Sequence, residues 1–141
     1  MKTFITLLVC LISISITKAQ ETGLIGTWNI FEFEVINNDD INTRTHENLF
    51  SENSIWDLFF MDNKSFKQSS NMRSGELESH KGLWETSKEN LKLSLMVQEQ
   101  KIVLNYNYKL KDNILVLRRV NPKGTLKLKI TFIKKEEHKS K

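Results

Sequence analysis

The regular alternation of apolar and polar residues is the feature of this sequence that most constrains its fold. From residue 26 onward, apolar residues recur at every second position, and no stretch carries a helical period. Tight turn signals such as Asp62-Asn63 and Ser74-Gly75 separate the alternating segments. The pattern predicts strands over residues 26–36, 54–61, 65–72, 77–87, 91–97, 102–110, 114–120 and 126–132.

Eight consecutive strands joined by short turns predict an all-β fold, an eight-stranded antiparallel up-and-down (meander) barrel. Closure of the sheet removes the unpaired edges that an open sheet has to protect. A barrel of this size has an interior that is either filled by side chains or just wide enough for one small ligand.

The first strand changes its buried face partway along. Trp28 and Ile30 share one face with Glu32, whereas Phe31 and Phe33 lie on the other. Because side chains alternate strictly in a strand, this switch predicts a β-bulge or a sharp bend after Ile30.

The segment after the first strand, residues 37–53, is polar and is expected to be irregular. It is the longest connection in the chain, and such connections are typically functional lids or mobile segments. We expect Leu49 and Phe50 to pack this loop against the body of the protein.

The first 19 residues have the pattern of a secretory signal peptide. Lys2 precedes an apolar run over residues 4–16, and Thr17-Lys18-Ala19 offers a cleavage site before Gln20. We therefore expect an exported protein, periplasmic or extracellular, with a domain over residues 20–135 and a charged tail over 136–141. Cys10 is the single cysteine, so the processed chain would hold no disulfide, thiol nucleophile or zinc-thiolate site.

Charge and motif content exclude several functions. The formal net charge of +4 falls to +2 when Lys2 and Lys18 are removed, and we interpret this small charge as spread along the chain, which argues against nucleic-acid binding. His46, His80 and His138 lack metal-ligand spacing, and there is no nucleophile elbow or phosphate-binding loop. We expect no enzyme activity, no metal and no cofactor.

Gly26-Thr27-Trp28, directly after the leader, resembles the Gly-x-Trp opening of the lipocalins and of the small lipocalin-like proteins exported by bacteria. The resemblance extends over residues 24 to about 133. It implies that Gly26 and Trp28 lie at the closed floor of the barrel. It also implies an arginine over the indole ring, for which Arg118 and Arg119 are the candidates.

The resemblance implies binding of a small hydrophobic ligand inside the barrel. The residues expected to contact it are Trp56, Phe60, His80, Trp84, Tyr106 and Tyr108. Two interpretations stay open for each type of residue. The tryptophans either pack in the core or line a cavity, and the tyrosine hydroxyls contact either the ligand or water at the rim. His80 is either an interior contact or partly exposed. A second hypothesis is a packed barrel that binds a protein partner through the 37–53 loop.

Overall fold

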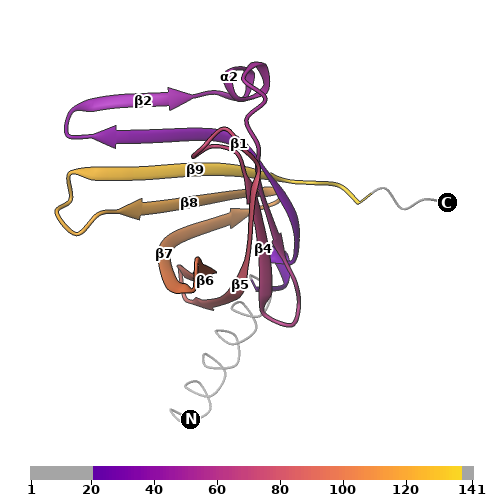
Figure 1. The fold of residues 1–141 in the computed structure, drawn as a ribbon. Coiled ribbons are helices and arrows are strands. Elements are labelled where there is room, and N and C mark those ends of the chain that lie inside the picture. Colours follow the sequence, from indigo (N-terminus) through magenta and orange to yellow (C-terminus); the bar gives the residue numbers. More distant parts are fainter. Residues whose placement is uncertain (1–20, 138–141) are drawn as a thin grey trace, which may run out of the picture.

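The structure, a computed structural model, describes residues 21–137. Residues 21–24 are helical, and the elements that follow are nine strands and one short helix (Figure 1). Their bounds are β1 Gly26–Asn37, β2 Asp40–Arg44, α2 His46–Ser51, β3 Trp56–Phe60, β4 Ser65–Ser70, β5 Glu78–Ser87, β6 Asn90–Val97, β7 Gln100–Lys111, β8 Ile114–Val120 and β9 Leu126–Lys134. The expected leader, residues 1–19, lies outside the described residues.

Eight strands close into a barrel. Strands β3 to β9 each pair antiparallel with the next one along the chain, and β1 pairs with β3 on one side and with β9 on the other. This is the all-β meander barrel that the alternation predicts. The core residues of the described part all lie between Leu24 and Phe132. Residues 21–137 therefore contain a closed sheet with its own core.

The β-bulge predicted in the first strand is confirmed. The pairing of β1 with β9 shifts register between Ile30 and Glu32, so that Phe31 has no partner on β9. The extra residue changes which positions of β1 face inward. Trp28 and Ile30 pack toward the core before the bulge, and Phe33 does so after it.

The prediction that residues 37–53 form an irregular loop is wrong. The segment forms β2, which pairs with the second half of β1, and the short helix α2. Asn38, at φ 53°, makes the tight turn into β2. Thr45 caps α2 in a reciprocal capping box with Asn48.

The ends of β1, β9 and β8 run beyond the barrel and, together with β2, form a four-stranded extension (Figure 1). We call this extension, residues 33–44 and 118–130, the flap. Strand β7 pairs with β8 only as far as Arg118, so the flap has left the barrel wall from this point.

Candidate functional site

The end of the barrel where β1 begins is closed by residues 21–25. Trp28 is fully buried, and its indole Nε1 donates a hydrogen bond of 2.8 Å to the carbonyl oxygen of Leu24. Leu24 is itself fully buried. The segment before β1 therefore covers this end of the barrel and is held in place by its hydrogen bond to the Trp28 ring.

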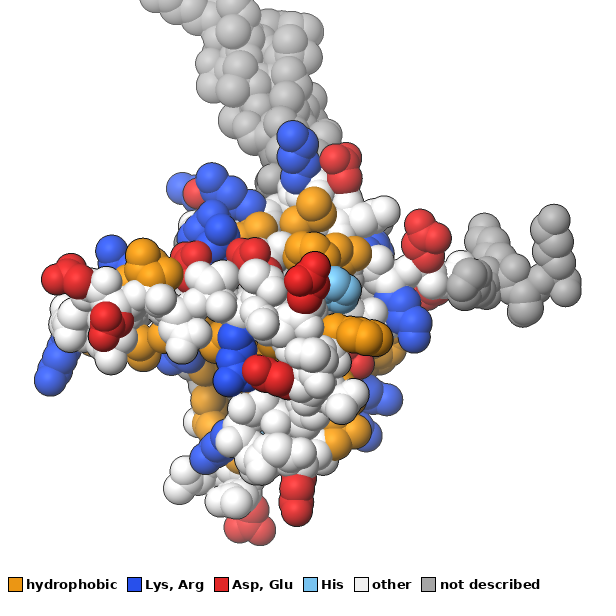
Figure 2. Space-filling model, turned by 90° about the horizontal axis from the view of Figure 1, so that it is seen from above, with side chains coloured by type: hydrophobic (Ala, Val, Ile, Leu, Met, Phe, Trp, Pro, Cys, Tyr) orange, Lys and Arg blue, Asp and Glu red, His pale blue; other side chains and the backbone are white. Residues whose placement is uncertain are grey.

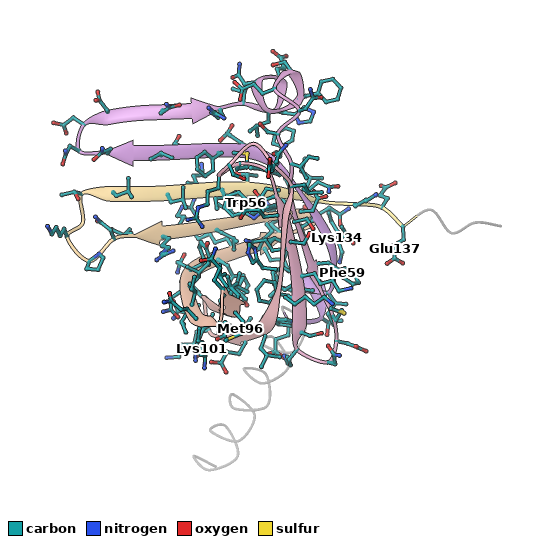
Figure 3. All side chains as sticks on the ribbon, viewed as in Figure 1. Trp56, Phe59, Met96, Lys101, Lys134 and Glu137 are labelled. Atoms are coloured by element: carbon teal, nitrogen blue, oxygen red, sulfur yellow. The ribbon has the colours of Figure 1, made fainter. Side chains whose placement is uncertain are left out.

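The cation at this floor is Lys134, which corrects the expectation of Arg118 or Arg119. Lys134 Nζ lies 5.4 Å from the centre of the Trp28 ring and donates a 3.1 Å hydrogen bond to the carbonyl of Gly23. The sheet register explains the difference, because it pairs Trp28 with Lys134 but pairs Arg118 with Lys129, which lies five residues before Lys134 on β9. In Figure 3, Lys134 lies on the side of the barrel from which the C-terminal segment leaves.

Gly26 has a clear physical role at the floor. Its φ of +128° is rarely adopted by residues with a side chain, and a Cβ at this position would come within 2.9 Å of Lys134 Cε. The glycine thus lets the Lys134 side chain cross the backbone on its way to Trp28. Gly26 and Trp28 both lie at the closed end, as the resemblance implies.

Above the floor, the interior is filled by aromatic and aliphatic side chains. Phe60 and Trp84 meet edge to face with ring centres 5.6 Å apart. Trp84 Nε1 donates to the carbonyl of Met61 at 3.0 Å, and Lys64 Nζ covers its ring at 4.2 Å. Phe60 and Trp84, which were expected to contact ligand, are therefore part of the packed core.

Tyr106 and Tyr108 also face the interior and are buried, at 5% and 4% exposed. Burial raises the pKa of the Tyr106 hydroxyl above its ordinary value of 10.0, and the nearby Arg119 guanidinium opposes this shift. Burial likewise raises the pKa of Tyr108, and Glu21 adds to that shift. Both rings pack within the core cluster, and neither lines the cavity described next.

The opposite half of the interior contains a cavity of about 350 Å³. It is formed by the start of β3, the end of β4 and the turn after it, the start of β5, the end of β6 and the start of β7. One part of its wall is apolar and consists of Trp56, Met72, Leu95, Val97, Ile102 and Leu104. The polar part consists of Gln68, Ser70, Arg73, Glu78 and His80. Small-molecule sites have volumes in this range, with mainly apolar walls and a few placed polar groups.

Trp56 is the one residue of β3 that lines this cavity. Its ring packs edge to face against Phe132, with centres 5.8 Å apart, and lies 6.1 Å from the Phe33 ring. Its indole Nε1 is buried but has no hydrogen-bond partner, the one such side-chain atom in residues 21–137. This nitrogen is thus enclosed by its neighbours, and leaving a buried donor unpaired costs stability. Figure 3 shows Trp56 inside the fold, between the flap and the lower strands.

The polar wall is built by strand register. Gln68 pairs with His80 and Ser70 pairs with Glu78 across β4 and β5, while Trp56 pairs with Ser70 across β3 and β4. Of the six residues predicted to contact ligand, only Trp56 and His80 line the cavity. Gln68, Ser70 and Met72 were not predicted to line a cavity, although Gln68 and Ser70 share the inward face of β4 with Phe66.

Within residues 21–137, neither a metal site nor a membrane-spanning helix is present. No group of three or more His, Cys, Asp and Glu side chains is placed to hold a metal ion. None of the helices in this range has the length and apolar character needed to cross a membrane.

The fold of this chain is similar to that of solved structures of other proteins. No protein-family model matches the sequence, and no curated protein matches it. Among solved structures, a lipocalin-like protein from Bacteroides uniformis ATCC 8492 is similar with a TM-score of 0.53 and 16% identity, over 80% of this chain and 99% of that one. An uncharacterized protein from Bacteroides eggerthii DSM 20697 is similar with a TM-score of 0.52 and 14% identity, over 79% and 98%. The chain therefore has the lipocalin-like barrel fold that the Gly-x-Trp motif and the strand count predict.

Proposed function

We propose that this protein is an exported, non-catalytic barrel that binds a small hydrophobic ligand in the cavity at Trp56. The observation that carries the proposal is the contrast between the two halves of the interior. The half at Trp28 is packed, whereas the half at Trp56 leaves about 350 Å³ between mainly apolar walls. Removal of apolar ligand surface from water would supply the affinity, at about 25 cal/mol per Å².

The polar groups of the cavity would set the orientation of the ligand. The side chains of Gln68, Ser70 and His80, each of which can donate a hydrogen bond, line this space. Arg73 and Glu78 lie on the same wall and have opposite charges. This arrangement favours a neutral, mostly apolar molecule with at least one hydrogen-bond acceptor.

The proposal is tested by filling the cavity. Ser70→Trp places an indole in the cavity, whereas Ser69→Trp places the same side chain on the outer face of β4, where Ser69 contacts Ser79. Residues 20–141 are titrated with the neutral apolar fluorophore Nile red. We expect uptake by the wild-type protein and by Ser69→Trp, and loss of uptake in Ser70→Trp. Equal uptake by all three proteins, or none by the wild type, would overturn the proposal.

Export rests on the leader-like residues 1–19 and is tested separately. The full chain is expressed with its natural leader, and the mass of the exported product is measured. We expect export and a product that begins at Gln20. Retention of the intact chain in the cytoplasm would contradict this part of the proposal without affecting the ligand site.

A second candidate function is protein binding through residues 37–53. The observation that favours it is an exposed apolar surface: Phe50 and Ile41 are 79% and 67% exposed, and His46 stacks on Phe31 with ring centres 4.9 Å apart. Figure 2, which views the molecule from above, shows a histidine beside a group of hydrophobic side chains on this face. If this candidate is correct, Ile41→Ser with Phe50→Ser would abolish capture of a partner and leave Nile red uptake unchanged.

A further inference from the structure

The charges of this chain are strongly segregated, so the interpretation that they are spread along it is wrong. Residues 100–134 contain nine Lys and Arg and only one acidic residue, Asp112. Residues 21–99 contain seven Lys and Arg against fourteen Asp and Glu. The small net charge of the whole chain hides this contrast. The positive segment corresponds to β7, β8 and β9, which are neighbours in the barrel (Figure 1).

Strand alternation brings five of these cations, in addition to Lys101 at the start of β7, to the outside of the barrel. Leu115, Leu117, Ile130 and Phe132 point inward and are buried, so the residues between them point outward. We call the outward set Lys109, Lys111, Arg118, Lys127 and Lys129 the basic face. The sheet register brings its members close together, because Arg118 pairs with Lys129 and Lys127 pairs with Val120.

The basic face is not neutralised by acidic side chains. The three ion pairs within residues 21–137 involve Arg44, Lys64 and Lys92, all on other elements. The nearest acidic residue by register is Glu34, the partner of Lys129 on β1, and its carboxylate accepts a hydrogen bond from Thr43 Oγ1. Unpaired cations on one face make a positive surface that attracts anions.

Three of the cations line a groove on the outside of the flap. Arg118, Lys127 and Lys129, with Glu34, Ile36 and Val120, surround a space of about 180 Å³. Cationic side chains around a groove of this kind suit a phosphate group, which guanidinium and ammonium groups bind with charge-assisted hydrogen bonds.

Exposed apolar side chains lie among the cations and decide the kind of anionic partner. Ile114, Val120 and Ile133, all on β8 and β9, are 47%, 55% and 37% exposed. A lipid surface offers both phosphate groups and an apolar layer beneath them, which a nucleic acid does not. The aromatic residues of β7 to β9 point inward and are buried, so the outer face has no stacking platform for bases.

We propose that the basic face docks this protein on the surface of a membrane that contains anionic phospholipids. The cations contact lipid phosphates, and Ile114, Val120 and Ile133 enter the interfacial layer. The site lies outside the barrel and does not depend on a ligand in the cavity at Trp56.

The test measures binding of residues 20–141, which lack the apolar leader, to sedimented vesicles. Vesicles of phosphatidylcholine with phosphatidylglycerol are compared with vesicles of phosphatidylcholine alone. The variant Arg118→Gln/Lys127→Gln/Lys129→Gln removes three cations of the basic face. The matched control Lys67→Gln/Lys81→Gln/Lys88→Gln removes three unpaired cations from the acidic part of the chain, with the same change in net charge.

We expect the wild type to bind the anionic vesicles and not the neutral ones. Each lost cation should weaken binding about fivefold, so the first triple variant should bind about 100-fold more weakly and the control nearly as well as the wild type. Nile red uptake and the circular dichroism spectrum show that each variant is folded. Equal losses in the two triple variants, or no preference for anionic vesicles, would overturn the proposal.

A second pair of measurements separates a membrane from other polyanions. Val120→Ser with Ile114→Ser leaves every charge in place, and we expect it to weaken vesicle binding. If vesicle binding is unchanged in this variant, or if a DNA duplex binds the wild type more tightly than the anionic vesicles at equal salt, the surface recognises polyanions in general and the membrane proposal fails.

Discussion

Replacement of Trp28 by alanine should strongly destabilise the barrel. The ring is fully buried at the closed end, so truncation leaves a cavity that costs about 3–5 kcal/mol. The buried carbonyl of Leu24 also loses its donor, a 2.8 Å hydrogen bond, and such a loss costs about 1–3 kcal/mol. Because the two costs overlap, we expect the free energy of unfolding to fall by about 4–5 kcal/mol in total.

Trp56→Ala is the matched comparison, because it truncates the same kind of side chain in the other half of the interior. Trp56 is only partly buried and already borders an open cavity, and its indole Nε1 makes no hydrogen bond. Its truncation enlarges an existing space and leaves no carbonyl unpaired. We expect a loss of only about 1–2 kcal/mol.

Urea unfolding of residues 20–141, followed by circular dichroism, measures both variants. A domain of this size has a total stability on the order of 10 kcal/mol, so Trp28→Ala should lower the urea midpoint by nearly half. Trp56→Ala should change it much less and should weaken Nile red uptake. If Trp56→Ala costs as much stability as Trp28→Ala, the assignment of a closed end and an open end is refuted.

Three further predictions follow from other contacts. Gly82→Ala should destabilise the fold by about 1–3 kcal/mol, because its Cβ would lie 2.0 Å from the carbonyl oxygen of Ser94 on β6; an unchanged urea midpoint would contradict this. Lys134→Met keeps the aliphatic chain but loses the hydrogen bond to Gly23 and the cation over Trp28, and should cost about 1 kcal/mol in the same assay. Since burial holds the pKa of Tyr106 above its ordinary 10.0, the folded state keeps a proton that the unfolded state has lost, so stability should be intact below pH 10 and fall above it. Tyr106→Phe should make this alkaline fall smaller when urea midpoints are compared on either side of pH 10; an identical fall in both proteins would contradict the assignment.

The strands of the barrel could be read from the sequence because their signal is local. Inward residues of each strand are apolar and outward residues polar, and the switch of faces around Ile30 located the bulge before any partner strand was known. The hairpin and helix within residues 37–53 could not be found in this way. Strand β2 is exposed at every position, so its pairing with β1 leaves no apolar pattern, and α2 depends on the caps at Thr45 and Asn48.

The site was harder to predict because it depends on register and packing between distant strands. The Gly-x-Trp motif located the floor, but whether Lys134 or an arginine reaches Trp28 depends on how β9 aligns with β1. Likewise, the face shared by Phe66 and Ser70 was visible in the sequence. The sequence did not show at which residue of that face the packed core ends and the cavity begins.

The segregation of charge was present in the sequence, but only in counts made segment by segment. A net charge for the whole chain averages the acidic residues 21–99 with the basic residues 100–134. The register of β8 with β9 then turns a basic segment into one continuous face, which the sequence alone does not place.

The indole N–H signals in a ¹⁵N-resolved NMR spectrum test the central claim most directly. Trp28 and Trp84 donate hydrogen bonds to the carbonyls of Leu24 and Met61, whereas the N–H of Trp56 is unpaired beside the cavity. On titration with Nile red, we predict that the Trp56 signal moves and that the other two stay in place. Movement of the Trp28 signal instead, or no movement of the Trp56 signal while the dye binds, would contradict a ligand site in the open half of the barrel.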